Sequence, residues 1–240
     1  MNNIKKKLMI VSLLLLLLFI ALAPILLTEI NNQNLINKPN IVTISTESTE
    51  RSHSNNNFST MERICTIVNA NNQKTGIITE QKKLNLSEQQ VKEIFNKMQY
   101  QIKNLQNQSV LPSFDIAENY NKIDISKRMY VEAIDSNEVV STWEIMLDND
   151  AFSIRAVIDV NTSIIYEISI FSRIDKQGFD VSRVETSNYF KYLNIESNIM
   201  SFKPQAASLS WYYNLKINDN QYVTFNCIVK PYYIEYNFIR

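Results

Sequence analysis

Glycine is scarce in this chain, which has Gly76 and Gly178 as its two glycines among 240 residues. Dinucleotide-binding and phosphate-binding loops need several glycines at fixed spacing, because their backbone must approach the phosphates closely. The nucleophile elbow of hydrolases and the glycine-rich loop of kinases need them as well. The sequence therefore excludes these motifs.

Histidine and cysteine are equally scarce, with one histidine and two cysteines. His53 lies in a run of serine and asparagine that offers no packed neighbours to orient an imidazole base. Zinc sites need ligands at short spacing, such as C-x-x-C, whereas Cys65 and Cys227 are far apart in the sequence. We therefore expect no catalytic, cofactor-binding or metal-ligating residue, no cofactor, and a protein that is not an enzyme.

Carboxylates are scattered throughout the chain, so a carboxylate-only active site or a calcium site stays open. The densest cluster is Asp148, Asn149 and Asp150. It lies between two predicted strands, where Asn and Asp are favoured for their hydrogen bonds to the backbone. We interpret it as a turn.

The two cysteines lie in apolar, strand-like stretches. Outside the cytoplasm, Cys65 and Cys227 could form a disulfide that closes a long loop. Free cysteine is also among the most buried residue types, so two buried thiols are the alternative. The sequence leaves both open.

Neither sign of charge is in excess, because 24 basic residues stand against 24 acidic ones. Three of the basic residues are Lys5, Lys6 and Lys7, so 21 remain beyond residue 7 (24 − 3 = 21). Phosphate neutralisation needs clustered Lys and Arg, which this remainder lacks. We therefore expect no nucleic-acid partner.

One long apolar run follows these lysines, from residue 8 to residue 27. A helix over such a run is about 30 Å long, which matches the hydrocarbon core of a bilayer. The lysines favour a cytoplasmic N-terminus. We predict a cytoplasmic tail at 1–7 and a transmembrane anchor in contact with lipid at 8–28, with the rest outside the cytoplasm.

A cleaved secretory signal is the alternative to an anchor. Its apolar core is usually shorter, about 7–15 residues. The small-x-small sequence Ala21-Leu22-Ala23 is followed at once by Pro24, which disfavours cleavage there. We therefore expect an uncleaved anchor.

Residues 29–60 are rich in Asn, Ser, Thr and Glu. Such a segment buries too little apolar surface to offset the entropy of ordering it. We predict a flexible linker.

Residues 61–172 predict a first α+β unit. We expect short strands at 62–70 and 76–80, followed by a helix in which Ser87 and Gln90 form a capping box and an apolar stripe begins at Val91. An antiparallel meander should follow, with strands at 127–134, 139–147, 152–160 and 164–171. The helix would cover one face of the sheet.

Residues 173–240 predict a second, shorter unit of the same plan. Asp180 could cap a helix over 181–195, with strands at 209–217, 222–229 and 232–239. Placing Trp211 on Trp143 without gaps brings Leu215 onto Leu147, Glu235 onto Glu167 and Phe238 onto Ile170. We therefore predict two units in tandem.

The end of the chain is rich in aromatic residues. Tyrosine has an apolar body and a polar tip and is favoured at interfaces, so Tyr213, Tyr233 and Tyr236 are candidates for an interaction surface. The alternative is that β-strands simply prefer aromatic residues.

The runs 142–147 and 156–166 resemble the C-terminal half of a PepSY-type module, in which a helix precedes a meander with an Asp-Ala-x-Thr-Gly-x-Ile-like hairpin. Asp159, Thr162 and Ile164 occupy the matching positions, while Val160 replaces the usual alanine and Ser163 the usual glycine. A similar ending occurs in YycI-type membrane-anchored regulators. The resemblance implies a non-catalytic role: inhibiting or regulating a peptidase, or modulating another envelope protein.

The sequence thus favours a single-pass membrane protein whose extracytoplasmic α+β portion binds or regulates another envelope protein. Two alternatives stay open. One is an extracytoplasmic hydrolase that uses paired carboxylates, and the other is a structural subunit of an envelope assembly.

Overall fold

The computed structural model describes residues 41–42, 58–71, 76–81, 84–116, 120–132, 139–173, 178–205, 210–218 and 221–239. The chain divides into two compact units, Met1–Lys38 and Pro39–Arg240, and all described residues belong to the second. The predicted tail and anchor, residues 1–28, lie outside the described residues. So does most of the predicted linker.

The second unit is an α+β domain, as predicted. Its helices are α2 (Thr60–Asn71), α3 (Glu88–Asn107) and α4 (Asn188–Leu193), followed by the 3-10 turn η1 (Glu196–Asn198). Its strands are β1 (Ile41–Val42), β2 (Gly76–Gln81), β3 (Lys122–Glu132), β4 (Val139–Asp148), β5 (Phe152–Asp159), β6 (Ile165–Ser172), β7 (Ile199–Gln205), β8 (Ser210–Asn218), β9 (Gln221–Lys230) and β10 (Tyr233–Ile239). None of the helices among these residues is long and apolar enough to cross a membrane.

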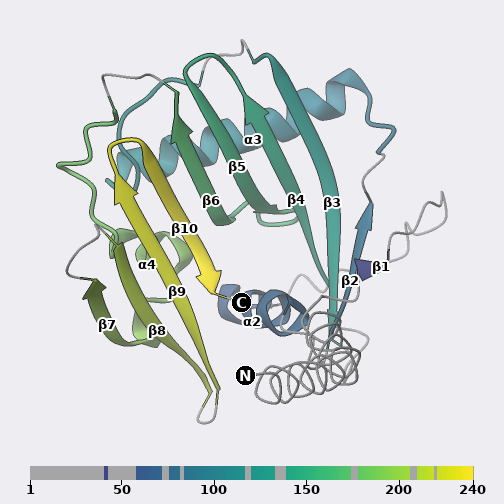
Figure 1. Cartoon of the computed structure of the whole chain (residues 1–240). Coiled ribbons are helices and arrows are strands. Elements are labelled where there is room, and N and C mark those ends of the chain that lie inside the picture. The colour runs from purple at the N-terminus through teal and green to yellow at the C-terminus, as the bar shows by residue number, and fades with distance from the viewer. Residues whose placement is uncertain are drawn as a thin grey trace, which may run out of the picture. The chain divides into compact units, whose positions relative to one another are not determined.

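The strands form one sheet in the order β1-β2-β3-β4-β5-β6-β10-β9-β8-β7 (Figure 1). Neighbouring strands are antiparallel except β1 and β2, which are parallel. Strands β3 to β6 make one meander and β7 to β10 make another. The two meanders are joined through their last strands, because β6 pairs with β10.

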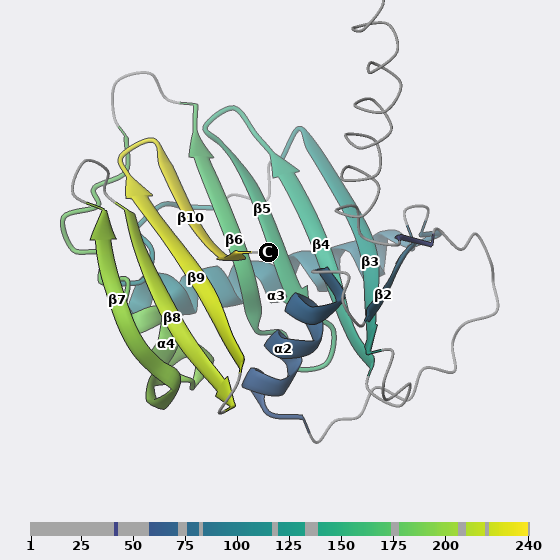
Figure 2. The ribbon, with the colours of Figure 1, turned by 60° about the horizontal axis from the view of Figure 1, so that its bottom comes forward.

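Helix α3 begins at the predicted capping box, in which Ser87 and Gln90 bond each other's backbone N–H groups. Its buried residues recur at helical spacing and form the predicted stripe: Ile94, Phe95, Met98, Ile102 and Leu105. Figures 1 and 2 both show α3 crossing behind the strands. The helix covers one face of the sheet, as expected.

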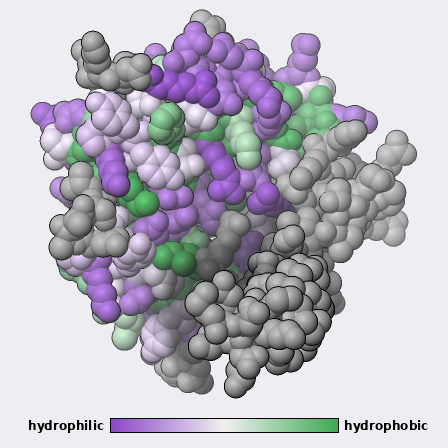
Figure 3. Space-filling model, in the orientation of Figure 1, coloured by the Kyte–Doolittle hydropathy of each residue, from purple (hydrophilic) through white to green (hydrophobic). Residues whose placement is uncertain are grey.

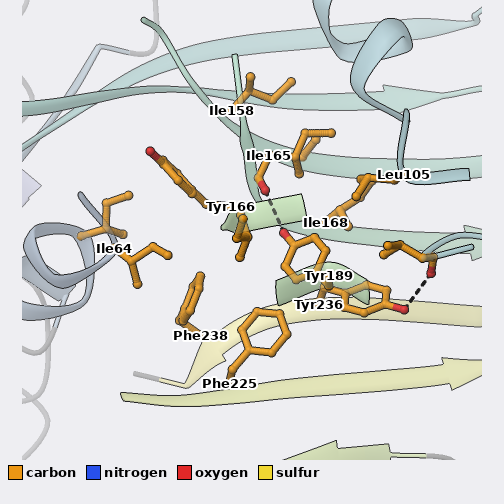
Figure 4. Close-up of a cluster of buried hydrophobic side chains, with 14 of the residues drawn as sticks. Ile64, Leu105, Ile158, Ile165, Tyr166, Ile168, Tyr189, Phe225, Tyr236 and Phe238 are labelled. Atoms are coloured by element: carbon orange, nitrogen blue, oxygen red, sulfur yellow. Dashed lines mark hydrogen bonds between the residues drawn. The ribbon is translucent and has the colours of Figure 1, made fainter. Parts of the chain in front are cut away.

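The core lies between α3 and the sheet. On β5, the alternate residues Phe152, Ile154, Ala156 and Ile158 are at most 5% exposed. Tyr189 of α4 lies 4.8 Å from Tyr236 and 5.2 Å from Phe225 between ring centroids (Figure 4). Aromatic residues from the second meander therefore complete a single core with the first.

The prediction of a strand at 62–70 is wrong, because this segment is helix α2. Ser59 and Glu62 cap it: the Glu62 carboxylate accepts from the Ser59 backbone N–H, and the Ser59 hydroxyl accepts from the Glu62 N–H. Ile64, Ile67 and Val68 are buried at helical spacing. Their β-branched side chains favour a strand in isolation, and packing overrides that preference.

Helix α2 lies near the turn between β5 and β6 (Figure 2) and contacts β2, β3, β4 and β8. Four strands separate β4 from β8 in the sheet. In a flat sheet that separation would be about 24 Å, whereas a helix of this length spans about 18 Å. Figures 1 and 2 show that the sheet is curved, which brings both strands toward the same helix.

The predicted second α+β unit, residues 173–240, differs from its prediction near its N-terminal end. The helix expected over 181–195 is reduced to α4, and Asp180 accepts hydrogen bonds from the backbone and hydroxyl of Ser182 instead of capping a long helix. Strands β1 and β7 were not predicted, and β1 lies within residues 29–60, where we expected a flexible linker. The other strands lie within two residues of their predicted bounds, except β3, which begins at Lys122.

Candidate functional site

The face of the sheet turned away from α3 carries most of the charged side chains of the strands, and we call it the outer face. Figure 3 shows this face, where hydrophilic residues predominate. The residues of the outer face follow from the strand register, because directly paired residues lie on the same face of a sheet. The pairs run from Ser126 to Glu144, Val157 and Glu167 across β3, β4, β5 and β6. These residues therefore form one row across the sheet.

Four residues of the outer face form what we call the outer charged cluster: Arg128, Glu144, Arg155 and Glu167. The Glu144 carboxylate lies 2.6 Å from an Arg128 guanidinium nitrogen and 2.5 Å from Arg155 Nε. A second Arg155 nitrogen lies 3.9 Å from Glu167. Glu144 and Glu167 are only 4% and 5% exposed. Arg155 thus bridges two buried carboxylates.

Large apolar side chains flank this cluster. Met146 is 47% exposed and is paired with Arg155, while Phe171 is 52% exposed and is paired with Ser153. Tyr233 of β10 is paired with Phe171 and is half-buried. Burial and the neighbouring Glu235 carboxylate raise the pKa of Tyr233 to about 12. The outer face therefore combines a buried ionic centre with an exposed apolar rim.

A second buried cluster joins α2 to the turn between β5 and β6. Arg63 of α2 lies 3.1 Å from the Asp159 carboxylate, and the Tyr166 hydroxyl donates to the same oxygen at 3.0 Å. The other Asp159 oxygen accepts from the backbone N–H groups of Asn161 and Thr162, both at 2.8 Å. Burial, and then the Asp159 charge, raise the pKa of the Tyr166 phenol. Asp159 is closed off from solvent, which indicates a structural role.

The turn that follows Asp159 contains a strained residue. Ser163 has φ of 60°, in the left-handed region. A non-glycine residue costs free energy there because its Cβ approaches the carbonyl oxygen. The hydrogen bonds to Asp159 hold the turn in this conformation.

Two open grooves run along α3. The larger, about 540 Å³, lies between α3 and residues 113–116, and the smaller, about 450 Å³, lies between α3 and Tyr120. Across the larger groove the Gln99 side chain donates to the Ile116 carbonyl, and Gln106 donates to the carbonyls of Pro112 and Phe114. These bonds fasten the segment to the helix, and the groove brings no charged cluster together.

Two of the three tyrosines predicted to form an interaction surface are buried. Tyr213 is 7% exposed and Tyr236 is fully buried. Both point to the α3 side, where Tyr213 bonds the Thr186 hydroxyl and Tyr236 donates to the Val110 carbonyl. Tyr233 alone belongs to the outer face. Side chains alternate between the two faces of each strand, so some tyrosines face the core and others face outward. The sequence does not reveal which of them face the core.

Neither Cys65 nor Cys227 is in a disulfide in the structure. Cys65 lies on α2 and is partly exposed, whereas Cys227 lies on β9 and is buried. Burial raises the pKa of the Cys227 thiol well above its usual range.

The acidic cluster 148–150 forms the predicted turn. The Asn149 side chain accepts from the backbone N–H groups of Ala151 and Phe152, Asp148 pairs with Arg173, and Asp150 accepts from Asn121. Within the described ranges, no group of three or more His, Cys, Asp or Glu side chains is placed to hold a metal ion. His53 lies outside those ranges.

The sequence reasoning did not identify Glu144, Arg155 and Glu167 as a cluster. A signal was present: each is a single charge between apolar neighbours in its own predicted strand, as in Trp143-Glu144-Ile145. Charges of alternating sign on three successive strands of a meander are cross-strand neighbours if the register is known. The register was the missing information.

No family model matches this chain, and neither a curated protein nor a solved structure shows significant similarity to it.

Proposed function

We propose that this chain is a single-pass membrane protein whose domain lies outside the cytoplasm and binds or regulates another envelope protein without catalysis. The observation that carries the proposal is the exposed apolar rim of Met146 and Phe171 beside the outer charged cluster. Exposed apolar patches that are rimmed by polar residues mark protein-binding surfaces. Here the rigid sheet holds both in place.

The membrane part of the proposal rests on the sequence. Residues 1–7 would form the cytoplasmic tail, 8–28 the anchor and 29–60 the linker, within which residues 41–42 pair with β2. A reporter enzyme that is active only outside the cytoplasm, fused after Arg240, tests this topology. Activity of a cytosolic reporter at the same position would contradict it.

We also propose that the two meanders are tandem PepSY-like units, 61–172 and 173–240. The alignment of Trp211 on Trp143 has an offset of 68 residues (211 − 143 = 68) and makes Ile168 equivalent to Tyr236. These two residues are paired with each other where β6 meets β10. If the second unit is a copy of the first and the two are related by a local two-fold axis, one residue is expected to pair with its own equivalent in the copy, as Ile168 and Tyr236 do.

The conformation of Ser163 supports the PepSY-like resemblance. Ser163 stands where that family usually has glycine, and its φ of 60° is one that glycine adopts without strain. Two of the three matching residues, Asp159 and Thr162, are bonded in the same turn, where the Asp159 carboxylate accepts from the Thr162 backbone N–H.

Site-specific photo-crosslinking in membranes tests the binding function. We expect a photoreactive phenylalanine analogue at Phe171 or Met146 to capture a discrete partner. The same analogue at Tyr100, which is 69% exposed on α3, is the matched control and should capture none. Equal capture from all three positions, or capture from Tyr100 alone, would contradict the proposal. A large complex in native electrophoresis would favour the structural-subunit alternative.

The hydrolase alternative has one candidate pair, Glu144 and Glu167. Paired-carboxylate hydrolysis needs an open space between the two acids for substrate and water. Arg155 contacts both carboxylates and bridges that space. We therefore favour binding over hydrolysis.

A further inference from the structure

Two asparagines meet on the outer face beside the junction of the meanders. Asn226 of β9 and Asn237 of β10 are directly paired across the strands. Asn226 is 8% exposed. The Oδ1 atoms of both residues are buried and have no hydrogen-bond partner within the described part of the chain. We call these residues the asparagine pair.

Unpartnered buried acceptors are uncommon, because a buried polar atom that loses water without gaining a partner is destabilising. A neighbouring asparagine on the same face shows the usual arrangement. Asn214 of β8 donates to the Ser201 hydroxyl and accepts from Thr224. The asparagine pair thus differs from Asn214, because its two Oδ1 atoms accept no hydrogen bond from the described part of the chain.

Acidic groups surround the pair. The Asn237 side-chain nitrogen donates to the Glu235 carboxylate at 3.1 Å, which fixes the orientation of that amide. Tyr236 is paired with Ile168, so continuing the register by one residue places Asn237 beside Glu167. Arg155 lies 3.9 Å from Glu167. Two carboxylates and the two unpartnered amide oxygens therefore lie on neighbouring strands of the outer face.

We propose that the asparagine pair, with Glu167 and Glu235, binds a protonated amine or guanidinium group, presented as a lysine or arginine side chain of the partner protein. Such a group carries several N–H donors and a positive charge, and the site offers acceptors and negative charge. This inference rests on the proposed function, because it assigns the chemistry by which that partner is recognised. Met146 and Phe171 would contact the apolar surface around the basic side chain.

Substitution of the asparagine pair tests the inference in the full-length protein. The probe is a fluorescein-labelled lysine-rich peptide, compared with the same peptide acetylated on every lysine Nε. We expect N226L and N237L each to weaken binding of the lysine peptide by about tenfold, which corresponds to losing one hydrogen bond to a charged group. The acetylated peptide should not bind.

Thermal unfolding distinguishes a binding site with unpartnered Oδ1 atoms from a pair of asparagines that bond each other and stabilise the fold. If the Oδ1 atoms are unpartnered, N226L should leave the midpoint unchanged or raise it. A lowered midpoint would mean that the two asparagines bond each other, which would overturn the inference. N214L is the matched control: it removes a partnered amide on the same face, so it should lower the midpoint and leave peptide binding unchanged.

The failure of this inference is distinguishable from failure of the proposed function. If Phe171 still captures its partner in membranes while N226L binds the lysine peptide as well as the natural protein does, the cation site is wrong and the binding function stands. If the lysine peptide binds and N226L abolishes binding, but no partner is captured from Phe171 or Met146, the site stands and the proposed function is wrong.

Discussion

Asp159 uses both of its carboxylate oxygens within the chain, and this makes it the most constrained acidic residue described. One oxygen meets Arg63 and the Tyr166 hydroxyl, and the other accepts two backbone N–H groups. The side chains of Arg63 and Asp159 are 1% and 0% exposed. Each therefore depends on the other to compensate its buried charge.

Removing one member of this pair should be strongly destabilising. Arg63→Met leaves the Asp159 carboxylate buried without its cation, and we expect a loss of about 3–5 kcal/mol in the free energy of unfolding. Urea unfolding measures the change. Arg173→Met, which removes a partly exposed ion pair with Asp148, is the control and should cost less than about 1 kcal/mol. Similar losses in the two variants would contradict the assigned role.

Relief of the strain at Ser163 should be stabilising. In Ser163→Gly the left-handed conformation no longer costs about 1–2 kcal/mol, and the larger entropy of glycine in the unfolded chain offsets part of that gain. We expect a net increase of about 0.5–1 kcal/mol, measured by urea unfolding. Thr162→Gly in the same turn should instead destabilise, because the structure gives Thr162 no positive φ.

Tyrosine hydroxyl groups connect α4 and β10 to the rest of the core through hydrogen bonds. The Tyr189 hydroxyl donates to the Ile165 carbonyl, and the Tyr236 hydroxyl donates to the Val110 carbonyl. Burial is the main cause that raises the pKa of both phenols well above their ordinary value. Packing of these elements therefore requires neutral phenols.

Alkaline pH should consequently weaken the fold. The folded pKa of each phenol lies above the unfolded value of about 10, so its stabilising contribution is complete below pH 10 and is lost as pH rises beyond that value. We expect the thermal midpoint to fall as pH rises from about 10 to about 12, in step with phenolate absorbance. Tyr236→Phe should reduce the dependence. A midpoint independent of pH over this range would contradict the assignment.

Sequence patterns predicted the elements whose periodicity agrees with their packing. The stripe from Ile94 to Leu105 and the capping box of Ser87 gave α3 correctly, and alternation gave most strands. In α2 the pattern of Ile64, Ile67 and Val68 is helical, but β-branched residues favoured a strand. The outer charged cluster depends on the register between neighbouring strands, and the position of Asn237 beside Glu167 depends on the register between strands 70 residues apart (237 − 167 = 70), which local patterns do not contain.

At the scale of the whole molecule, one sheet passes through both predicted units. Ile234 and Tyr236 of β10 are paired with Ile170 and Ile168 of β6, and these side chains are buried in the shared core. A separated first unit would expose the β6 edge together with its apolar side chains. Edges of that kind promote association.

The two units should therefore not fold independently. We expect a fragment of residues 58–172 to aggregate or to lack a cooperative thermal transition, whereas residues 58–240 should unfold in one step. Circular dichroism and size-exclusion chromatography measure both properties. A monomeric 58–172 fragment with a cooperative transition would show that the junction between β6 and β10 is dispensable.

If residues 8–28 are the proposed membrane anchor, the short parallel strand β1 limits how far the domain can lie from the bilayer. Ile41 and Val42 are held against Ile78 and Thr79 of β2, so an anchor ending at residue 28 would leave only residues 29–40 as a free connection (40 − 28 = 12). Fully extended, that connection reaches about 40 Å. If the proposed anchor and the proposed cation site are both correct, the partner would present its basic side chain within reach of this connection and of the domain, which favours a membrane neighbour over a distant soluble target.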